Sequence, residues 1–216
     1  MISCLADAVR RRRTTTVRVE GHALSVPPGV LDPVRFRTGA AWAPRVAAAV
    51  ARRPELRLLD LGCGCGVVGV LAAAAGARVT ASDLDRRACA AARDNGLSDV
   101  VHGDLFSPLA GRRFDLICFN PPFFVGMGLL RPYRRALYGG PGLSTLRAFA
   151  ARAPQHLFPG GQAWVLLSDR APHAHKALGP GWTIRERWSL PLGSAAPEEL
   201  TVWARRRVSS PNASAG

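Results

Sequence analysis

Residues 58–70, LLDLGCGCGVVGV, decide the fold that we expect for this chain. An apolar run that includes Asp60 leads into a loop in which glycines alternate with Cys63 and Cys65, and a second apolar run follows. Glycines let the backbone turn tightly and let a ligand approach main-chain atoms. The stretch therefore predicts a buried strand, a glycine loop at its carboxyl end, and a helix.

The sequence continues as an alternation of strands and helices. The expected strands are apolar runs at residues 56–62, 77–83, 99–105, 113–123 and 160–168. The expected helices occupy residues 40–54, 67–76, 84–96 and 143–158. Residues 182–192 and 199–207 predict a closing pair of strands. This order predicts an α/β fold with a Rossmann-like, doubly wound, mostly parallel seven-stranded sheet and an antiparallel closing strand pair.

We expect one domain with short extensions. Residues 1–26 form an N-terminal extension, in which TTTVRVEGHALSV at 14–26 predicts a hairpin or an edge strand. Residues 27–207 form the α/β domain, and residues 208–216 form a disordered tail. Within the domain we expect a loop at 27–39, followed by a helix that begins near Pro44 and ends before Pro54.

Composition limits the classes of protein that the chain can belong to. No apolar run reaches the roughly 18 residues of a membrane helix, and the N-terminal charges follow the apolar residues instead of preceding them. We therefore expect a cytoplasmic protein without a membrane partner. The five cysteines have no disulfide spacing. The net charge of +14 favours nucleic acid or acidic partners, or reflects an arginine-rich solvated surface.

The glycine loop admits three interpretations. A metal site is the weakest, because Cys63 and Cys65 have no second pair of ligands at a suitable spacing, and we expect no metal. The GxGxxG match of residues 64–69, with Asp83 downstream, is formally that of a dinucleotide loop. However, the carboxylate of Asp60 would repel a pyrophosphate. A carboxylate beside the loop suits a ligand with a positive end.

The loop resembles the first motif of class I methyltransferases that use S-adenosyl-L-methionine. The resemblance implies that Asp60 lies near the methionine part of the cofactor, that Asp83 holds the ribose hydroxyls, and that Leu84 lines the adenine. It also implies that Asp104 lies near the adenine amine and Leu105 against the ring. The full set of implied cofactor-binding residues is Thr38, Asp60, Gly62, Cys63, Gly64, Gly66, Asp83, Leu84, Asp104, Leu105 and Asn120.

FNPPFF, residues 119–124, carries the expected chemistry. It follows an apolar strand, and its two prolines form a rigid turn that lacks two N–H donors. The side-chain carbonyl of Asn120 and the backbone carbonyl of Pro121 remain as acceptors for a target that donates N–H groups. Holding both hydrogens of an amide or aryl amine would aim the nitrogen lone pair at a methyl group. The expected catalytic residues are Asn120, Pro121, Pro122 and Phe123, the last by stacking on a planar target.

This string resembles the N-P-P-[YF] motif of methyltransferases that modify planar nitrogens. Three further stretches, at 28–39, 101–109 and 138–168, resemble segments of the HemK-like release-factor enzymes and the small-domain ribosomal RNA methyltransferases. The resemblance covers roughly residues 27–207 and places Thr38 near the cofactor. The segment before residue 27 is shorter than the helical substrate domain of the release-factor enzymes, and Phe123 stands where Tyr is commoner.

The sequence thus predicts a nitrogen methyltransferase whose acceptor is open. RNA, DNA and a protein glutamine are favoured, and a small molecule of specialised metabolism is the alternative. A NAD-binding oxidoreductase and a non-catalytic RNA-binding module are the alternatives from other classes. Arginines at 10–13, 131, 134 and 135 could follow a phosphate backbone, and the apolar stretch 123–130 could form a lid or a wall. The oligomeric state is open.

Overall fold

The computed structural model of the protein describes residues 13–122, 137–192 and 195–208. Several expectations fall outside these ranges: Phe123, the stretch 123–130, the arginines at 10–12, 131, 134 and 135, and the tail from residue 209. Within the described residues, no helix is long and apolar enough to cross a membrane.

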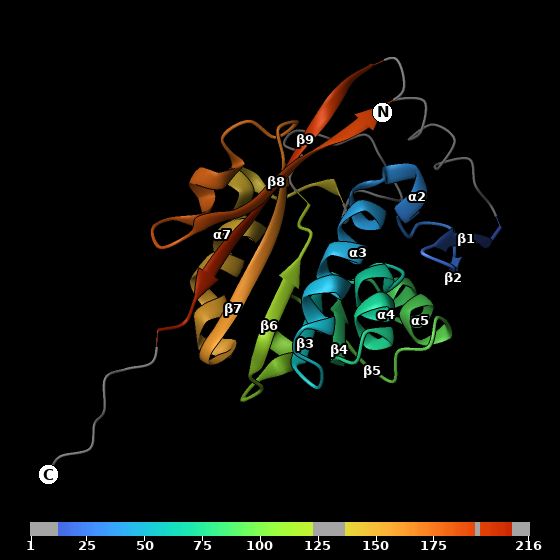
Figure 1. The fold of residues 1–216 in the computed structure, drawn as a ribbon, viewed down its shortest axis with the longest axis horizontal. Coiled ribbons are helices and arrows are strands. Elements are labelled where there is room, and N and C mark those ends of the chain that lie inside the picture. Colours follow the sequence, from blue (N-terminus) through green and yellow to red (C-terminus); the bar gives the residue numbers. More distant parts are fainter. Residues whose placement is uncertain (1–12, 123–136, 193–194, 209–216) are drawn as a thin grey trace, which may run out of the picture.

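The centre of the molecule is a seven-stranded sheet with the order β5-β4-β3-β6-β7-β9-β8 (Figure 1). The strands are β3 (Arg57–Leu61), β4 (Arg78–Asp83), β5 (Asp99–His102), β6 (Phe114–Phe119), β7 (Leu157–Ser168), β8 (Thr183–Leu192) and β9 (Ala195–Arg206). Strands β3 to β7 pair in parallel, whereas β9 pairs antiparallel with both β7 and β8. The predicted doubly wound sheet with its closing pair is confirmed.

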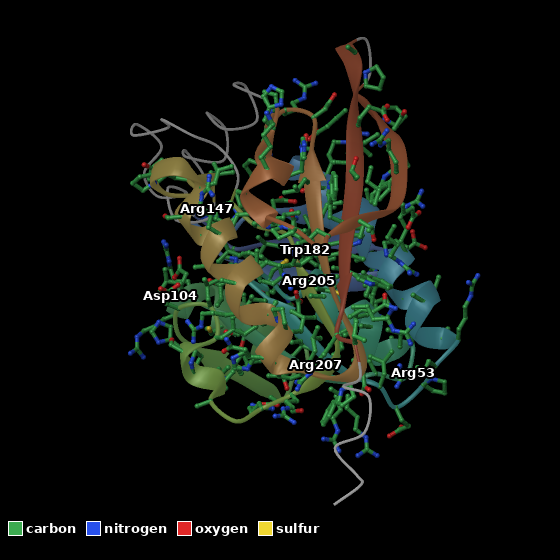
Figure 2. The ribbon with its side chains drawn as sticks, turned by 90° about the vertical axis from the view of Figure 1, so that its left-hand side faces the viewer. Arg53, Asp104, Arg147, Trp182, Arg205 and Arg207 are labelled. Atoms are coloured by element: carbon green, nitrogen blue, oxygen red, sulfur yellow. The ribbon has the colours of Figure 1, made fainter. Side chains whose placement is uncertain are left out.

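Helices cover both faces of the sheet. The helices α3 (Thr38–Ala51), α4 (Val67–Ala74) and α5 (Arg86–Asp94) share one core with the sheet and lie together in Figure 1. The helix α7 (Ser144–Arg152) and the short 3-10 helices η1 (Ser107–Leu109) and η4 (Ala174–Leu178) pack on the other face, in a core that includes Trp182 (Figure 2).

Alternation along β3 assigns its side chains to these two faces. Leu58 contributes to the core under α3 and α4, whereas Leu59 and Leu61 contribute to the core under α7. Asp60 therefore points toward the face that carries α4. A carboxylate in that position is buried between the sheet and a helix, which has consequences for the candidate site.

Residues 14–26 form the expected hairpin, a separate two-stranded sheet of β1 (Thr15–Val19) and β2 (His22–Val26). The two turn residues, Glu20 and Gly21, both have positive φ, which suits the twist of a two-residue hairpin. Leu24 and Val26 are fully buried in the core shared with α3 and α4. The hairpin thus covers the helices of the main sheet.

Two expectations about the segment before the main sheet were wrong. Residues 27–39 are not entirely a loop, because α2 (Pro33–Phe36) begins after Asp32, whose carboxylate accepts from the N–H groups of Val34 and Arg35. The next helix begins at Thr38, and Pro44 lies inside it. The aspartate cap and the proline at the first helical position favour α2. A proline within a helix costs one backbone hydrogen bond, and the packing of α3 on α4 compensates.

Asn95 at the end of α5 joins three segments. Its Oδ1 accepts from the Ser25 N–H at 2.7 Å, and its Nδ2 donates to the carbonyls of Ser25 at 2.9 Å and Cys65 at 2.8 Å. Asn95→Ala leaves these backbone groups unpaired. We expect it to lower the free energy of unfolding by about 1–3 kcal/mol in urea titrations.

Asp94→Ala on the same helix is the control, because Asp94 is exposed. We expect it to change the free energy of unfolding by no more than about 0.5 kcal/mol. If both variants unfolded at the same urea concentration, Asn95 would not fasten the hairpin to the domain.

Candidate active site

A pocket lies at the carboxyl ends of β3, β4 and β6. The chain runs outward from β3 to β4 and β5, and then returns to place β6 on the other side of β3. Ligands of open parallel sheets bind at this kind of switch point. The lining residues come from segments far apart in sequence: Gly29, Val30, Leu31, Pro33, Phe36, Gly39, Leu61, Gly62, Cys63, Gly64, Cys65, Val67, Ser82, Asp83, Leu84, Asp85, Ala88, Gly103, Asp104, Leu105, Phe119, Asn120, Pro122 and Thr145.

The glycine loop is fastened to the end of the neighbouring strand. The N–H groups of Gly62 and Cys63 donate to the carbonyl of Ser82, at 2.7 and 3.0 Å. Gly62 has a φ of 66°, and an added Cβ would lie 3.2 Å from the Phe119 ring. Gly64 has a φ of 56° and open space where a Cβ would stand, so the loop turns with its backbone exposed to the pocket.

Gly66 serves the packing of the helix and does not line the pocket. It precedes α4 with a φ of 84°, and an added Cβ would lie 3.3 Å from the Cα of Ala92 on α5. The predicted contact of Gly66 with a cofactor therefore stays a prediction, whereas its role in the close approach of α4 and α5 follows from the geometry. The predicted residues Gly62, Cys63 and Gly64 do line the pocket.

Asp83 at the end of β4 is a fixed acceptor on the pocket wall. Its two carboxylate oxygens accept from the Gly64 N–H at 2.9 Å and from the Asp85 N–H at 2.8 Å. A carboxylate has further lone pairs available for a ligand. Burial raises the pKa of Asp83, although the two backbone N–H groups oppose that shift. The next residue, Leu84, is 43% exposed, which is unusual for leucine and leaves an apolar surface beside the acid.

The loop after β5 completes this end of the pocket. The Gly103 N–H donates to the carbonyl of Asp83 at 3.0 Å, so the loop is held against the end of β4. Leu105 has a φ of 46°, a strained conformation for a leucine, and lines the pocket. Asp104 is exposed at the surface of the same loop (Figure 2). The structure thus brings Asp83, Leu84, Asp104 and Leu105 together as the sequence predicts.

Asp60 does not line the pocket. It is 4% exposed, and its Oδ2 accepts from the N–H of Gly69 in the first turn of α4 at 2.9 Å. Burial raises the pKa of Asp60 from its usual value near 3.8 to about 7, and the negative charge of Asp83 adds to the shift. The geometry makes Asp60 a cap for α4 from within the sheet, while its predicted nearness to a methionine moiety stays a prediction.

The turn after β6 forms the opposite end of the pocket. Asn120 and Pro122 line the pocket, and Pro121 is buried without lining it. The Nδ2 of Asn120 donates to the hydroxyl of Thr38 at 3.3 Å, so Thr38 reaches the pocket through Asn120. An added Cβ at Gly139 would lie 2.5 Å from the carbonyl oxygen of Pro122, which shows how closely the returning chain covers this turn.

The pocket is acidic although the protein is strongly basic. Three of the described lining residues, Asp83, Asp85 and Asp104, are acids, and none of the described lining residues is Lys, Arg or His. Asp85 forms an ion pair with Arg87 next to the pocket. An acidic wall attracts a cationic ligand and disfavours a pyrophosphate, so the electrostatics disfavour the dinucleotide interpretation of the loop.

The cysteines of the loop are buried thiols. Cys63 and Cys65 line the pocket with little exposure, and burial raises the pKa of both thiols, that of Cys65 to about 12. Thiols in this state are poor metal ligands and poor nucleophiles. In the described part of the chain, no group of three or more potential ligands is placed to hold a metal ion. Outside the pocket, the ring of His175 stacks on the ring of Trp203, with 5.2 Å between the two ring centroids.

Several pocket residues were not predicted from sequence. The wall from Gly29 to Phe36 comes from the segment that we expected to be a loop, and the Asp-Pro signal of α2 could have indicated an ordered wall. Thr145 lies in the first turn of α7 and comes from a distant segment, with no sequence signal of its own. Ser82 lines the pocket with a buried hydroxyl that has no partner among the described residues, which leaves a polar atom available to a ligand.

A family model and several curated relatives match this chain. The family model described as Methyltransferase small domain matches residues 46–179. A release factor glutamine methyltransferase from Xylella fastidiosa is 39% identical over 52% of this chain and 46% of its own length. A ribosomal RNA small subunit methyltransferase C from Alcanivorax borkumensis is 31% identical over 68% of this chain and 42% of its own length.

A solved structure shows the same fold. A 16S rRNA N2 methyltransferase from T. thermophilus, in complex with AdoMet and guanosine, aligns with a TM-score of 0.62 and 22% identity. The alignment covers 90% of this chain and 50% of that one. The chain thus spans about half the length of the relatives that it matches.

The buried carboxyl of Asp60 predicts a pH dependence of stability. Because its folded pKa of about 7 exceeds its usual 3.8, the folded state binds the proton more tightly than the unfolded state. This contribution is fully present below about pH 4 and is lost as the pH rises through 7. We expect the wild-type stability, measured relative to Asp60→Asn, to fall between pH 5 and 8 by about 3 kcal/mol, because about two pH units of the shift lie in that range.

Urea titrations at pH 5, 6, 7 and 8 measure this difference. Asn at position 60 keeps an oxygen for the Gly69 N–H, so the variant isolates the titration. Asp94→Asn, which removes an exposed carboxylate, is the matched control. A difference between wild type and Asp60→Asn that stays constant with pH would contradict the assignment.

Proposed function

The chain belongs to the methyltransferase small domain family, and from this premise we propose that it is an S-adenosylmethionine-dependent methyltransferase acting on a planar nitrogen. We further propose that the acceptor is an exocyclic base amine in RNA or DNA or a glutamine amide in a protein. The observation that carries the proposal is the position of Asn120 at one end of an acidic pocket whose other end has the features of an adenosine site.

The residues of the pocket fit S-adenosylmethionine. The cofactor carries a positive sulfonium, which suits a wall with three acids and no described base. Asp83 has acceptor capacity for ribose hydroxyls, and Leu84 and Leu105 offer apolar surface to an adenine. The open backbone at Gly64 and the unpartnered hydroxyl of Ser82 leave room and a polar partner for the amino acid part. When bound, this cofactor supplies a methyl group on a cationic sulfur.

Asn120 would orient the acceptor nitrogen. An amide or aryl amine attacks poorly because its lone pair is delocalised. The Oδ1 of Asn120 and a backbone carbonyl of the proline turn would each accept one N–H, which holds the nitrogen with its lone pair toward the methyl carbon. The two carbonyl dipoles also stabilise positive charge that develops on the nitrogen. The new N–C bond would replace the C–S bond of the cofactor, whose thioether would keep the electron pair. The methylated nitrogen would then release its proton to water, so the step needs no general base.

The relatives support a macromolecular acceptor. One is named for a release factor glutamine and another for ribosomal RNA, and a glutamine amide and an exocyclic base amine both present a planar NH2 group. The net charge of +14 is compatible with an anionic macromolecule. The same turn could serve either acceptor, because its proposed contacts are with the NH2 group and not with the rest of the acceptor molecule.

Methyl labelling tests the proposal. The chain is incubated with radiolabelled S-adenosylmethionine and, separately, with total RNA, DNA, protein and small-molecule fractions of its host. Label in RNA, DNA or protein supports the proposal. Label only in small molecules would indicate a small-molecule methyltransferase of specialised metabolism. Salt-sensitive RNA binding without label in any fraction would favour a non-catalytic binding module, and heat protection by NAD but not by S-adenosylhomocysteine would favour an oxidoreductase.

Substitution of Asn120 separates chemistry from cofactor binding. We expect Asn120→Ala to lower the rate of methyl transfer by about 100- to 1000-fold, as for the loss of a preorganised polar group at a reacting centre. If Asn120 holds the acceptor, the affinity of the variant for S-adenosylhomocysteine, measured by calorimetry, should change by less than about threefold, because Asp83 and the glycine loop are intact. A larger loss would instead assign Asn120 to the cofactor, as the sequence resemblance implies. A variant that kept the wild-type rate would overturn the assigned role of the proline turn.

A further inference from the structure

We propose that Thr38 is a positioning residue that acts through Asn120: its hydroxyl binds the amide nitrogen of Asn120 and thereby turns the amide oxygen toward the methyl acceptor. The inference rests on the proposed function, because it concerns the group that would hold the acceptor. It assigns to Thr38 a task different from contact with the cofactor, which is what the sequence resemblance implies.

The amide of Asn120 has two chemically opposite ends. Its Oδ1 accepts hydrogen bonds and its Nδ2 donates them. Only the oxygen can hold the N–H group of an acceptor, and an amide turned the other way would direct its own hydrogens at those of the acceptor. The Nδ2 donates to the hydroxyl of Thr38 at 3.3 Å, across 82 residues of sequence. This bond engages the donor end and leaves Oδ1 for the pocket.

The position of Thr38 is fixed by the strained turn that precedes it. Arg37 has a φ of 63° and a ψ of −35°, outside the regions that a non-glycine residue prefers. Its N–H donates to the carbonyl of Pro33 at 2.9 Å, and its carbonyl accepts from Ala41 at 2.8 Å. Arg37 is therefore both the C-cap of α2 and the N-cap of α3. Strain of this kind concentrates at functional sites.

Packing of the helices holds Thr38 against the pocket. The next residue, Gly39, lines the pocket, and an added Cβ there would lie 3.3 Å from Val67 at the start of α4. The start of α3 is thus pressed against the helix that follows the glycine loop. Because Thr38 is anchored to the cofactor side of the pocket, its bond to Asn120 sets the amide relative to that side.

The hydroxyl of Thr38 has no other task in the described residues that explains it. The N-cap of α3 is Arg37, which makes no side-chain capping bond, and Thr38 is the first residue of the helix. Removing the hydroxyl therefore leaves the helix start intact. A purely structural role would appear as lost stability, whereas a positioning role would appear in the turnover rate.

Two substitutions at this site test the inference by spectroscopy without a known acceptor. Thr38→Val keeps the shape and removes the hydroxyl, and Thr38→Ser keeps the hydroxyl. The chain has three asparagines, so the side-chain amide signals of a protein labelled with 15N-asparagine are few, and Asn120→Ala identifies the Asn120 pair. We expect these signals to shift in Thr38→Val and to remain near their wild-type positions in Thr38→Ser.

Kinetics with the host fractions and radiolabelled S-adenosylmethionine provide the second readout. We expect Thr38→Val to lower kcat by about 10- to 100-fold, as for a small misplacement of a catalytic group. Its KM for S-adenosylmethionine and its melting temperature should remain close to those of Thr38→Ser. In the Asn120→Ala background, Thr38→Val should cause no further loss, because residues that act through one group are not additive.

The outcomes separate this inference from the proposed function. Wild-type turnover in Thr38→Val beside a strongly slowed Asn120→Ala would overturn the positioning role and leave the methyltransferase proposal intact. Equal losses of cofactor affinity in Thr38→Val and Thr38→Ser, without a change in kcat, would also overturn it. Wild-type turnover in Asn120→Ala would instead contradict the proposed function. If Thr38→Val failed to fold, Thr38→Ala would provide the same comparison with Thr38→Ser.

Discussion

The rest of the site depends on the hydrogen bonds between the end of β4 and the glycine loop. The Ser82 carbonyl receives two N–H groups of the loop, and the Asp83 carboxylate receives a third, from Gly64. Because these bonds close the turn that leads into α4, they set where the helix starts and how much backbone faces the pocket. The carboxylate of Asp60 on β3 accepts a further hydrogen bond, from the N–H of Gly69 in α4. The pocket is therefore a product of strand-to-loop hydrogen bonding, which requires β3 and β4 to be neighbours in parallel.

The acidic pocket and the arginines of this basic chain lie in different parts of the molecule. The pocket has only acids among its described charged residues, whereas several arginines outside it are paired with acids, as in the ion pairs of Arg53 with Asp115 and of Arg112 with Asp99. Figure 2 shows Arg53 and Arg207 away from Asp104, on another part of the surface. Coulomb attraction is strongest in the partly buried pocket and weak at exposed pairs. The local excess of carboxylates, and not the net charge, determines which small ligand the pocket favours.

The fold and most of the pocket could be predicted from sequence because local signals specify them. The glycine loop, the acid that ends β4 and the proline turn each follow an apolar strand, and parallel strands bring their carboxyl ends to one edge. The start of α3 could not be predicted, because tertiary packing accommodates Pro44 and the strained turn at Arg37 begins the helix earlier. Nor could the burial of Asp60 be predicted, since its side of β3 depends on the packing of α4. The bond between Thr38 and Asn120 joins residues that no local pattern connects.

The proposed reaction takes place at a weak nucleophile, and the geometry around Asn120 indicates how it would proceed. The described lining residues include no His, Lys or Glu, and their three aspartates, Asp83, Asp85 and Asp104, lie at or after the ends of β4 and β5, at the other end of the pocket from Asn120. Orientation must then lower most of the barrier, and orientation requires rigid acceptors. The two prolines of the turn have fixed φ angles, and the backbone of Gly139 lies close to the carbonyl of Pro122. A side-chain amide has no such constraint of its own. In the proposed mechanism its orientation depends on a partner at its nitrogen end, and the hydroxyl of Thr38 at the start of α3 accepts this bond and makes no other among the described residues.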